Sequence, residues 1–145
     1  MGKLDRFFAR YEEGANTFDT KLISSQYAEC FLAGDPNGTV CIRNDAAFHK
    51  AIPERRDFFR QIGFKSAKVL GVQETALDER YTMAKLHWEM VFEKEPGQPL
   101  EFRFYISYFV FDDGSGPKVV SYISHDDEQK TMRDAGLLPT NGGRR

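Results

Sequence analysis

Four long runs rich in β-forming residues follow one another in the second half of the chain, over residues 64–76, 80–93, 100–111 and 118–125. The short segments between them carry Asp, Glu, Gly and Pro, and segments of this kind join neighbouring antiparallel strands. Helical spacing of apolar residues fills most of the first half of the chain. Helices followed by an antiparallel sheet predict an α+β fold, in which the helices pack on one face of a curved sheet.

Apolar residues at helical intervals predict three helices before this sheet and one after it. The first covers residues 3–13, and the second covers residues 18–33, whose apolar side chains fall on one broad face. Pro53 suits the first turn of a third helix that ends at Gly63, because the missing N–H of a proline has no partner there in any case. The last helix is expected over residues 127–135.

A short strand over residues 39–42 is expected between the second and third helices, and it makes the sheet mixed at this first strand. The length of 145 residues fits a single domain. We place that domain at residues 1–138. Residues 139–145, which contain paired glycines and paired arginines, are expected to form a flexible tail.

Composition excludes several classes of partner. The balance of 20 lysines and arginines against 22 acids gives a net charge of −2, which supplies no basic stripe for nucleic acid. No apolar run is long enough to span a membrane, and the start lacks a secretory signal, so we expect a cytoplasmic protein. Cys30 and Cys41 form no Cys-x-x-Cys pair and are expected to be small buried residues. The sequence contains no metal-ligand or cofactor motif, so neither group is expected.

Aromatic residues occupy both faces of the strand predicted over residues 100–111. Its even-numbered residues from 102 to 110 form one apolar face, and the opposite face still carries Tyr105 and Phe109. One face must meet the helices, and a large apolar patch is rarely left in water. We therefore expect the other face to meet a second copy of the chain, which gives a homodimer through the sheet face.

Asp45 and His49 are the candidate acid–base residues. Asp45 follows the short strand and is a candidate general base if its pocket excludes water. The alternative is an Asx turn or a cap that leads out of the strand. His49 can shuttle protons near neutral pH, or it can lie on the surface of a loop. The acids at residues 126–128, which follow His125, are interpreted as the cap of the final helix rather than as a metal cluster.

The order of these elements resembles the nuclear transport factor 2-like superfamily, and in particular its SnoaL-like branch with a cystatin-like α+β cone. The resemblance rests on three places. These are the helical hairpin from Asp5-Arg6-Phe7-Phe8 to Phe31, the segment Ile42-Arg43-Asn44-Asp45 with Arg56-Asp57-Phe58-Phe59-Arg60 after it, and the last hairpin over residues 107–122. The resemblance implies a cone, in which the sheet curls round the helices and leaves an apolar pocket at the open end.

Family isomerases use a carboxylate base with a tyrosine and a protonated acid as oxyanion donors. The resemblance implies that the base position falls near Asp45, the tyrosine near Phe7 and the acid near Ser107. Steroid-isomerase chemistry is therefore not expected, because a phenyl ring donates no hydrogen bond. The resemblance also implies that His49 lies at the pocket rim. The expected pocket residues are Tyr27, Trp88, Arg103, Tyr105, Ser107 and Tyr122.

These residues can also have purely structural roles instead of lining a pocket. An arginine among aromatic rings suits a carboxylate or phenolate ligand, but Arg103 can instead pair with Glu101 or with an acid on the neighbouring strand. The aromatic side chains can equally be core packing.

Two functional hypotheses follow. The first is a small-molecule pocket protein, whose ligand is apolar or aromatic and can be anionic. Whether the protein also catalyses an isomerase, cyclase or dehydratase reaction is left open, and no cofactor is expected. The second is a non-catalytic dimerisation or protein-interaction module that uses the outer sheet face. Convergence of Asp45, His49 and Arg103 on a void of roughly 300 Å³ favours the first. An interior filled by Phe7, Phe31 and Trp88 favours the second.

Overall fold

The computed structural model describes residues 2–138, so the tail expected at residues 139–145 lies outside the described residues. The chain forms four helices and six strands within this part. In chain order the elements are α1 (Asp5–Thr17), α2 (Thr20–Ser25), β1 (Tyr27–Asp35), β2 (Gly38–Arg43), α3 (Ala46–Gln61), β3 (Phe64–Ala76), β4 (Tyr81–Glu95), β5 (Gln98–Phe111), β6 (Lys118–Ser124) and α4 (Glu128–Asp134).

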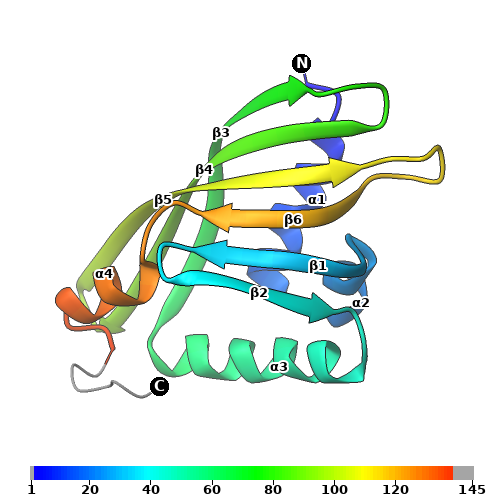
Figure 1. Cartoon of the computed structure of the whole chain (residues 1–145). Coiled ribbons are helices and arrows are strands. Elements are labelled where there is room, and N and C mark those ends of the chain that lie inside the picture. The colour runs from blue at the N-terminus through cyan, green and yellow to red at the C-terminus, as the bar shows by residue number, and fades with distance from the viewer. Residues whose placement is uncertain (1, 139–145) are drawn as a thin grey trace.

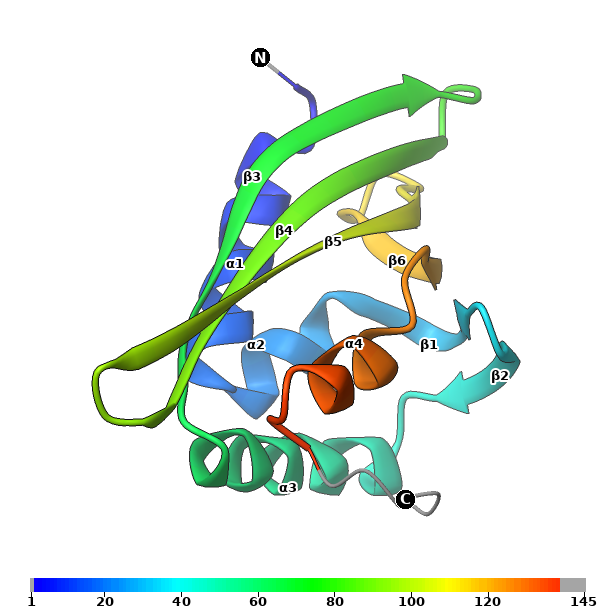
Figure 2. The ribbon, with the colours of Figure 1, turned by 90° about the vertical axis from the view of Figure 1, so that its left-hand side faces the viewer.

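The strands form one sheet in the order β2-β1-β6-β5-β4-β3, in which β1 and β6 run parallel and the other neighbours run antiparallel. The long strands β3, β4 and β5 bend strongly, and α1, α2 and α3 lie on the concave side of the sheet (Figures 1 and 2). The predicted α+β class, with helices on a curved mixed sheet, is confirmed.

The helix predicted over residues 18–33 is wrong in its second half. The observed helix α2 ends at Ser25, and β1 begins at Tyr27. Strand β1 pairs with β2 on one side and with β6 on the other, and these contacts override the helical spacing of its apolar residues. The parallel pair therefore involves β1, while the strand predicted at residues 39–42 is the edge strand β2.

Two helix boundaries also differ from the prediction. Helix α1 continues through Gly14, where a break was expected, and ends at Thr17, and Phe18 after it has the left-handed conformation. Helix α3 begins after Asp45 instead of at Pro53, which lies inside it. A proline in the second turn of a helix removes one hydrogen bond, and the strong cap at Asp45 sets the start of the helix instead.

The core lies between the helices and the concave face of the sheet. Phe8 of α1, Phe59 of α3, Leu86 of β4 and Phe92 of β4 are buried there. Helix α4 adds Met132, and Leu137 follows it into the same core. Figures 1 and 2 show α4 beside the end of the β1–β2 hairpin and close to α3, so it covers the end of the cone that these elements frame.

Polar side chains of α1 bond the free edge of β3. The amide of Asn16 donates to the carbonyl oxygen of Ala67 (2.7 Å) and accepts from its N–H (2.8 Å). The carboxylate of Glu12 accepts from the N–H of Val69 at 2.7 Å. These bonds satisfy backbone groups that an edge strand otherwise exposes, and they fix α1 against the sheet.

Candidate functional site

Tyrosine side chains from four elements meet inside the cone. The hydroxyl groups of Tyr11 on α1 and Tyr27 on β1 share a hydrogen bond. Trp88 on β4 donates its indole N–H to the hydroxyl oxygen of Tyr108 on β5, at 3.0 Å. The rings of Tyr11 and Tyr108 are 5.1 Å apart, and the ring of Tyr122 on β6 is 6.1 Å from that of Tyr108. We call these four tyrosines and Trp88 the tyrosine cluster.

Burial keeps the phenols of the cluster neutral. It raises the pKa of Tyr11, Tyr27 and Tyr108 well above the ordinary value, and the charges of neighbouring tyrosines act in the same direction. Burial also raises the pKa of Tyr122, although the positive charge of Arg55 offsets part of the effect. Each hydroxyl group therefore keeps its proton and can donate a hydrogen bond.

Aromatic rings surround these hydroxyl groups. Phe31 stacks on Tyr27 with ring centres 4.4 Å apart, and Phe48 of α3 packs edge-on against both rings. Tyr11 lies one turn after Phe8 on the apolar stripe of α1, and their rings are 5.9 Å apart. The hydroxyl groups thus stand in a largely apolar interior, where hydrogen bonds are stronger than in water.

Two charged residues lie at the end of the cone that α4 covers, and we call this pair the mouth. Arg55 is an exposed residue of α3, and its guanidinium group lies 4.4 Å from the centre of the Phe59 ring. Glu128 begins α4 and accepts a hydrogen bond from the Ser124 hydroxyl at 2.8 Å. Burial raises the pKa of Glu128, while Ser124 and the charge of Arg55 lower it in part.

Asp45 is an exposed helix cap. One of its carboxylate oxygens accepts from the N–H groups of Ala47 (3.1 Å) and Phe48 (3.2 Å). The capping alternative is therefore confirmed. The expected base stands at the start of α3 and does not join the tyrosine cluster.

His49 is tied to Tyr27 through Asn44. The Asn44 amide nitrogen donates to the carbonyl oxygens of Ser24 (2.9 Å) and Tyr27 (3.2 Å), so its oxygen must face the Nε2 atom of His49 at 2.8 Å. A neutral His49 therefore carries its proton on Nε2 and leaves Nδ1 as a free acceptor. The ring is partly buried beside the cluster, without a direct bond to a tyrosine hydroxyl.

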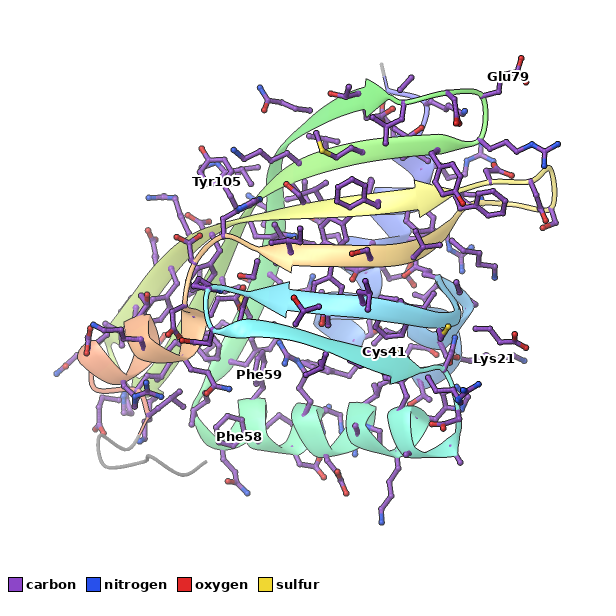
Figure 3. The ribbon with its side chains drawn as sticks, viewed as in Figure 1. Lys21, Cys41, Phe58, Phe59, Glu79 and Tyr105 are labelled. Carbon is purple, nitrogen blue, oxygen red and sulfur yellow. The ribbon has the colours of Figure 1, made fainter. Side chains whose placement is uncertain are left out.

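Arg103, Tyr105 and Ser107 lie on the opposite, convex face of the sheet. Arg103 pairs with Glu89 at 2.7 Å and with Glu101 at 3.6 Å, which confirms the surface-pairing alternative. Tyr105 stacks on His87 with ring centres 4.3 Å apart and is 44% exposed (Figure 3).

Ser107 is buried and bonds the ring of His125 at 2.8 Å, also on the convex face. Assigning this alternate set of β5 residues to the pocket was wrong, because side chains alternate and a shift of one residue exchanges the two faces.

The cone therefore brings together three of the predicted pocket residues, Tyr27, Trp88 and Tyr122. The prediction missed Tyr11, Tyr108, Arg55 and Glu128. The signals for two of them were present, since Tyr11 belongs to the apolar stripe of the first helix and Tyr108 to the apolar face of strand 100–111. Glu128 was interpreted with Asp126 and Asp127 as part of the cap of the final helix, and Asp127 is the residue that caps α4.

The interior is filled by side chains. The two clearest hollows of the described residues, about 330 Å³ and about 170 Å³, lie at the β3–β4 turn and between the β4–β5 turn and the end of α4. Phe31 and Trp88 are buried, and Phe7 packs against the core. The convergence of Asp45, His49 and Arg103 is not observed, so the criterion stated for the interaction module is met.

Three smaller findings complete the description. Cys30 on β1 and Cys41 on the edge strand β2 are both exposed, so the expectation that they are buried is wrong. Residues 2–138 contain no group of three or more His, Cys, Asp or Glu side chains that could hold a metal ion. Among the helices of these residues, none has the length and apolarity needed to cross a membrane.

The chain is similar to known proteins. A family model described as NTF2-like protein (DUF6841) matches residues 3–127. No curated protein matches the chain.

Solved structures resemble it at low identity. An NTF2-like protein with a cystatin-like fold from Novosphingobium aromaticivorans has a TM-score of 0.70 at 15% identity, over 94% of this chain and 86% of the other. Aln2 from a Streptomyces species has a TM-score of 0.70 at 10% identity, over 90% and 93%. The beta subunit of benzoate 1,2-dioxygenase from Burkholderia mallei has a TM-score of 0.68 at 11% identity, over 88% and 90%. At these identities the likeness shows the fold alone.

Proposed function

The chain belongs to the family NTF2-like protein (DUF6841), and we propose that it binds a small apolar or aromatic molecule inside its cone, through an acceptor oxygen of that molecule. The observation that carries the proposal is the tyrosine cluster. The hydroxyl groups of Tyr11, Tyr27 and Tyr108 and the indole N–H of Trp88 gather from α1, β1, β5 and β4 at one place in the interior.

A purely structural interior does not need these polar atoms. Phenylalanine fills nearly the same volume as tyrosine, and a buried hydroxyl loses its contacts with water on folding. Replacing both partners of such a hydrogen bond by apolar groups of the same shape can be nearly neutral for stability, so folding alone does not require the pair. Neutral donors that converge in an apolar site complement a carbonyl or phenolate oxygen, and the charge of Arg55 at the mouth suits an anionic ligand.

The same donors suit acid–base chemistry without a cofactor. Preformed O–H donors stabilise the negative oxygen that develops during isomerase, cyclase or dehydratase reactions. Because the interior is filled, a ligand must displace aromatic side chains, and α4 covers the end through which it would enter.

Trp88 is the only tryptophan of the chain, so its indole N–H gives a single, assignable nitrogen NMR signal from inside the cluster. We expect acetophenone or benzoate to shift this signal, and we expect Tyr11→Phe to weaken binding about tenfold, the effect of losing one neutral hydrogen bond. Tyr105→Phe, on the convex face, is the matched control and should bind like the wild type. A Trp88 signal unchanged by both compounds at millimolar concentration contradicts the proposal.

A second candidate function rests on the convex face of the sheet. Leu32, Tyr105 and Ile123 are 45%, 44% and 40% exposed there, and the partly buried Phe109 of β5 and Met83 of β4 lie on the same face. An exposed apolar patch of this kind is typical of an interaction surface. We propose that a second copy of the chain covers it, because the filled interior met the criterion for an interaction module.

A further inference from the structure

A row of residues crosses β3, β4 and β5 on the convex face of the sheet and ends in open space. Gly71 of β3 is paired with His87 of β4, and His87 is paired with Tyr105 of β5. The rings of His87 and Tyr105 stack with their centres 4.3 Å apart and their planes 4° from parallel. Neighbouring strands are about 4.8 Å apart, so a third ring in this stack would stand above Gly71. We call the space above Gly71 the gap.

The described part of the chain gives no reason for a glycine at residue 71. The register of β3 and β4 shifts there, but Gly71 does not have a positive φ, so this bulge does not depend on glycine. A Cβ atom added to Gly71 would meet no heavy atom of residues 2–138 within 4 Å. Val72, the next residue, packs against the core, so residue 71 faces outward. Glycine inside a strand often marks a place where a ligand or another chain approaches closely.

Tyr105 projects from the same row, on the second strand from Gly71. It is 44% exposed, and its ring is held between neighbours on β4. His87 stacks on it, and Nζ of Lys85 lies 5.0 Å from its centre. A tyrosine ring held in this way is a typical anchor of a protein interface, since little freedom of the side chain is lost on binding. The convex face therefore carries a projecting ring and a gap, with His87 between them.

We propose that two copies of the chain pack convex face to convex face, and that Tyr105 of each copy enters the gap above Gly71 of the other. A two-fold interface uses the same patch on both partners, so the patch must contain both complementary features. A two-fold axis at His87 exchanges the two ends of the row and places each Tyr105 ring over the opposite gap. Packed sheets are about 10 Å apart, a distance at which side chains of the two faces interdigitate.

This inference rests on the second candidate function, the dimer, and adds the contact that sets its geometry. Filling the gap tests it. Gly71→Leu should raise the dissociation constant of the dimer at least about tenfold, because the new side chain occupies the place of the Tyr105 ring. Gly71→Ala adds a single methyl group and should raise it less. Far-UV circular dichroism should show the wild-type fold in both variants, since the added atoms meet open space within the chain.

Tyr105 supplies the matched pair of variants. Tyr105→Ala removes the ring and should weaken the dimer as Gly71→Leu does, whereas Tyr105→Phe keeps the ring and should dimerise like the wild type. Once residue 105 is alanine, no ring enters the gap. Gly71→Leu should then add little to the loss, so the two changes should be strongly non-additive.

Sedimentation equilibrium over a range of protein concentrations gives the dissociation constants of the wild type, the single variants and the double variant. A wild-type dimer in which the two losses simply add overturns the Tyr105 contact and leaves the dimer standing. A dimer that Gly71→Leu does not weaken has the same meaning. A wild type that is monomeric at every concentration overturns both the dimer and the contact.

Discussion

Tyr108 shows what a single oxygen atom contributes inside the cone. It accepts the hydrogen bond that Trp88 donates, and both residues are buried. Tyr108→Phe should lower the free energy of unfolding by about 1–3 kcal/mol, because the indole N–H is left buried without an acceptor. Tyr105→Phe on the convex face should change it by less than about 0.5 kcal/mol. Urea denaturation of the three proteins checks this, and equal losses in both variants would contradict it.

Glu128 should make the stability of the chain depend on pH. Burial raises its pKa in the folded state, so the folded protein binds a proton more tightly than the unfolded chain does. The resulting stability is fully present below the unfolded pKa of about 4.3 and is lost as pH rises through the higher folded pKa. Across this window the wild type should lose stability relative to Glu128→Gln. Parallel profiles of unfolding free energy in urea would contradict the expectation.

At the scale of elements, Gly63 sets the angle between α3 and β3. Its φ is +85°, and a Cβ atom there would overlap the carbonyl oxygen of Glu93. Gly63→Ala should therefore cost roughly 3 kcal/mol of stability, from backbone strain and from displacement of β4. Gly97 has a similar φ of +82° with open space around it. Gly97→Ala should cost only about 1 kcal/mol, and urea melts that rank the two the other way would exclude this explanation.

Elements that depend on local pattern were predictable. The strands β3 to β6 were recognised from turn residues and alternation, and α1 from the stripe that ends in Tyr11. Strand β1 was not, because the pairing that makes it a strand involves β6, far away in sequence. The prediction of the site residues was limited in the same way. Which face of β5 points inward depends on where the helices pack, so Tyr108 was passed over and Ser107 was chosen.

For the whole molecule, the convex face predicts the oligomeric state. We expect light scattering to give a mass of twice the 16.7 kDa of one chain. Ile123→Lys places a charge in the apolar patch and should shift the protein to the monomer by at least tenfold in the dissociation constant. Leu77→Lys is the control, because Leu77 is 54% exposed at the β3–β4 turn, outside the patch. A wild-type monomer at working concentration would contradict the dimer.

The central claim is that the tyrosine cluster receives a ligand oxygen inside the cone. A crystal structure of the chain grown with acetophenone tests it most directly. The account predicts density for the ring among Phe31, Phe48 and Tyr122, with the carbonyl oxygen within hydrogen-bond distance of the Tyr11 or Tyr27 hydroxyl. Unchanged side-chain packing in the cone, with acetophenone seated only on the convex face, would contradict it.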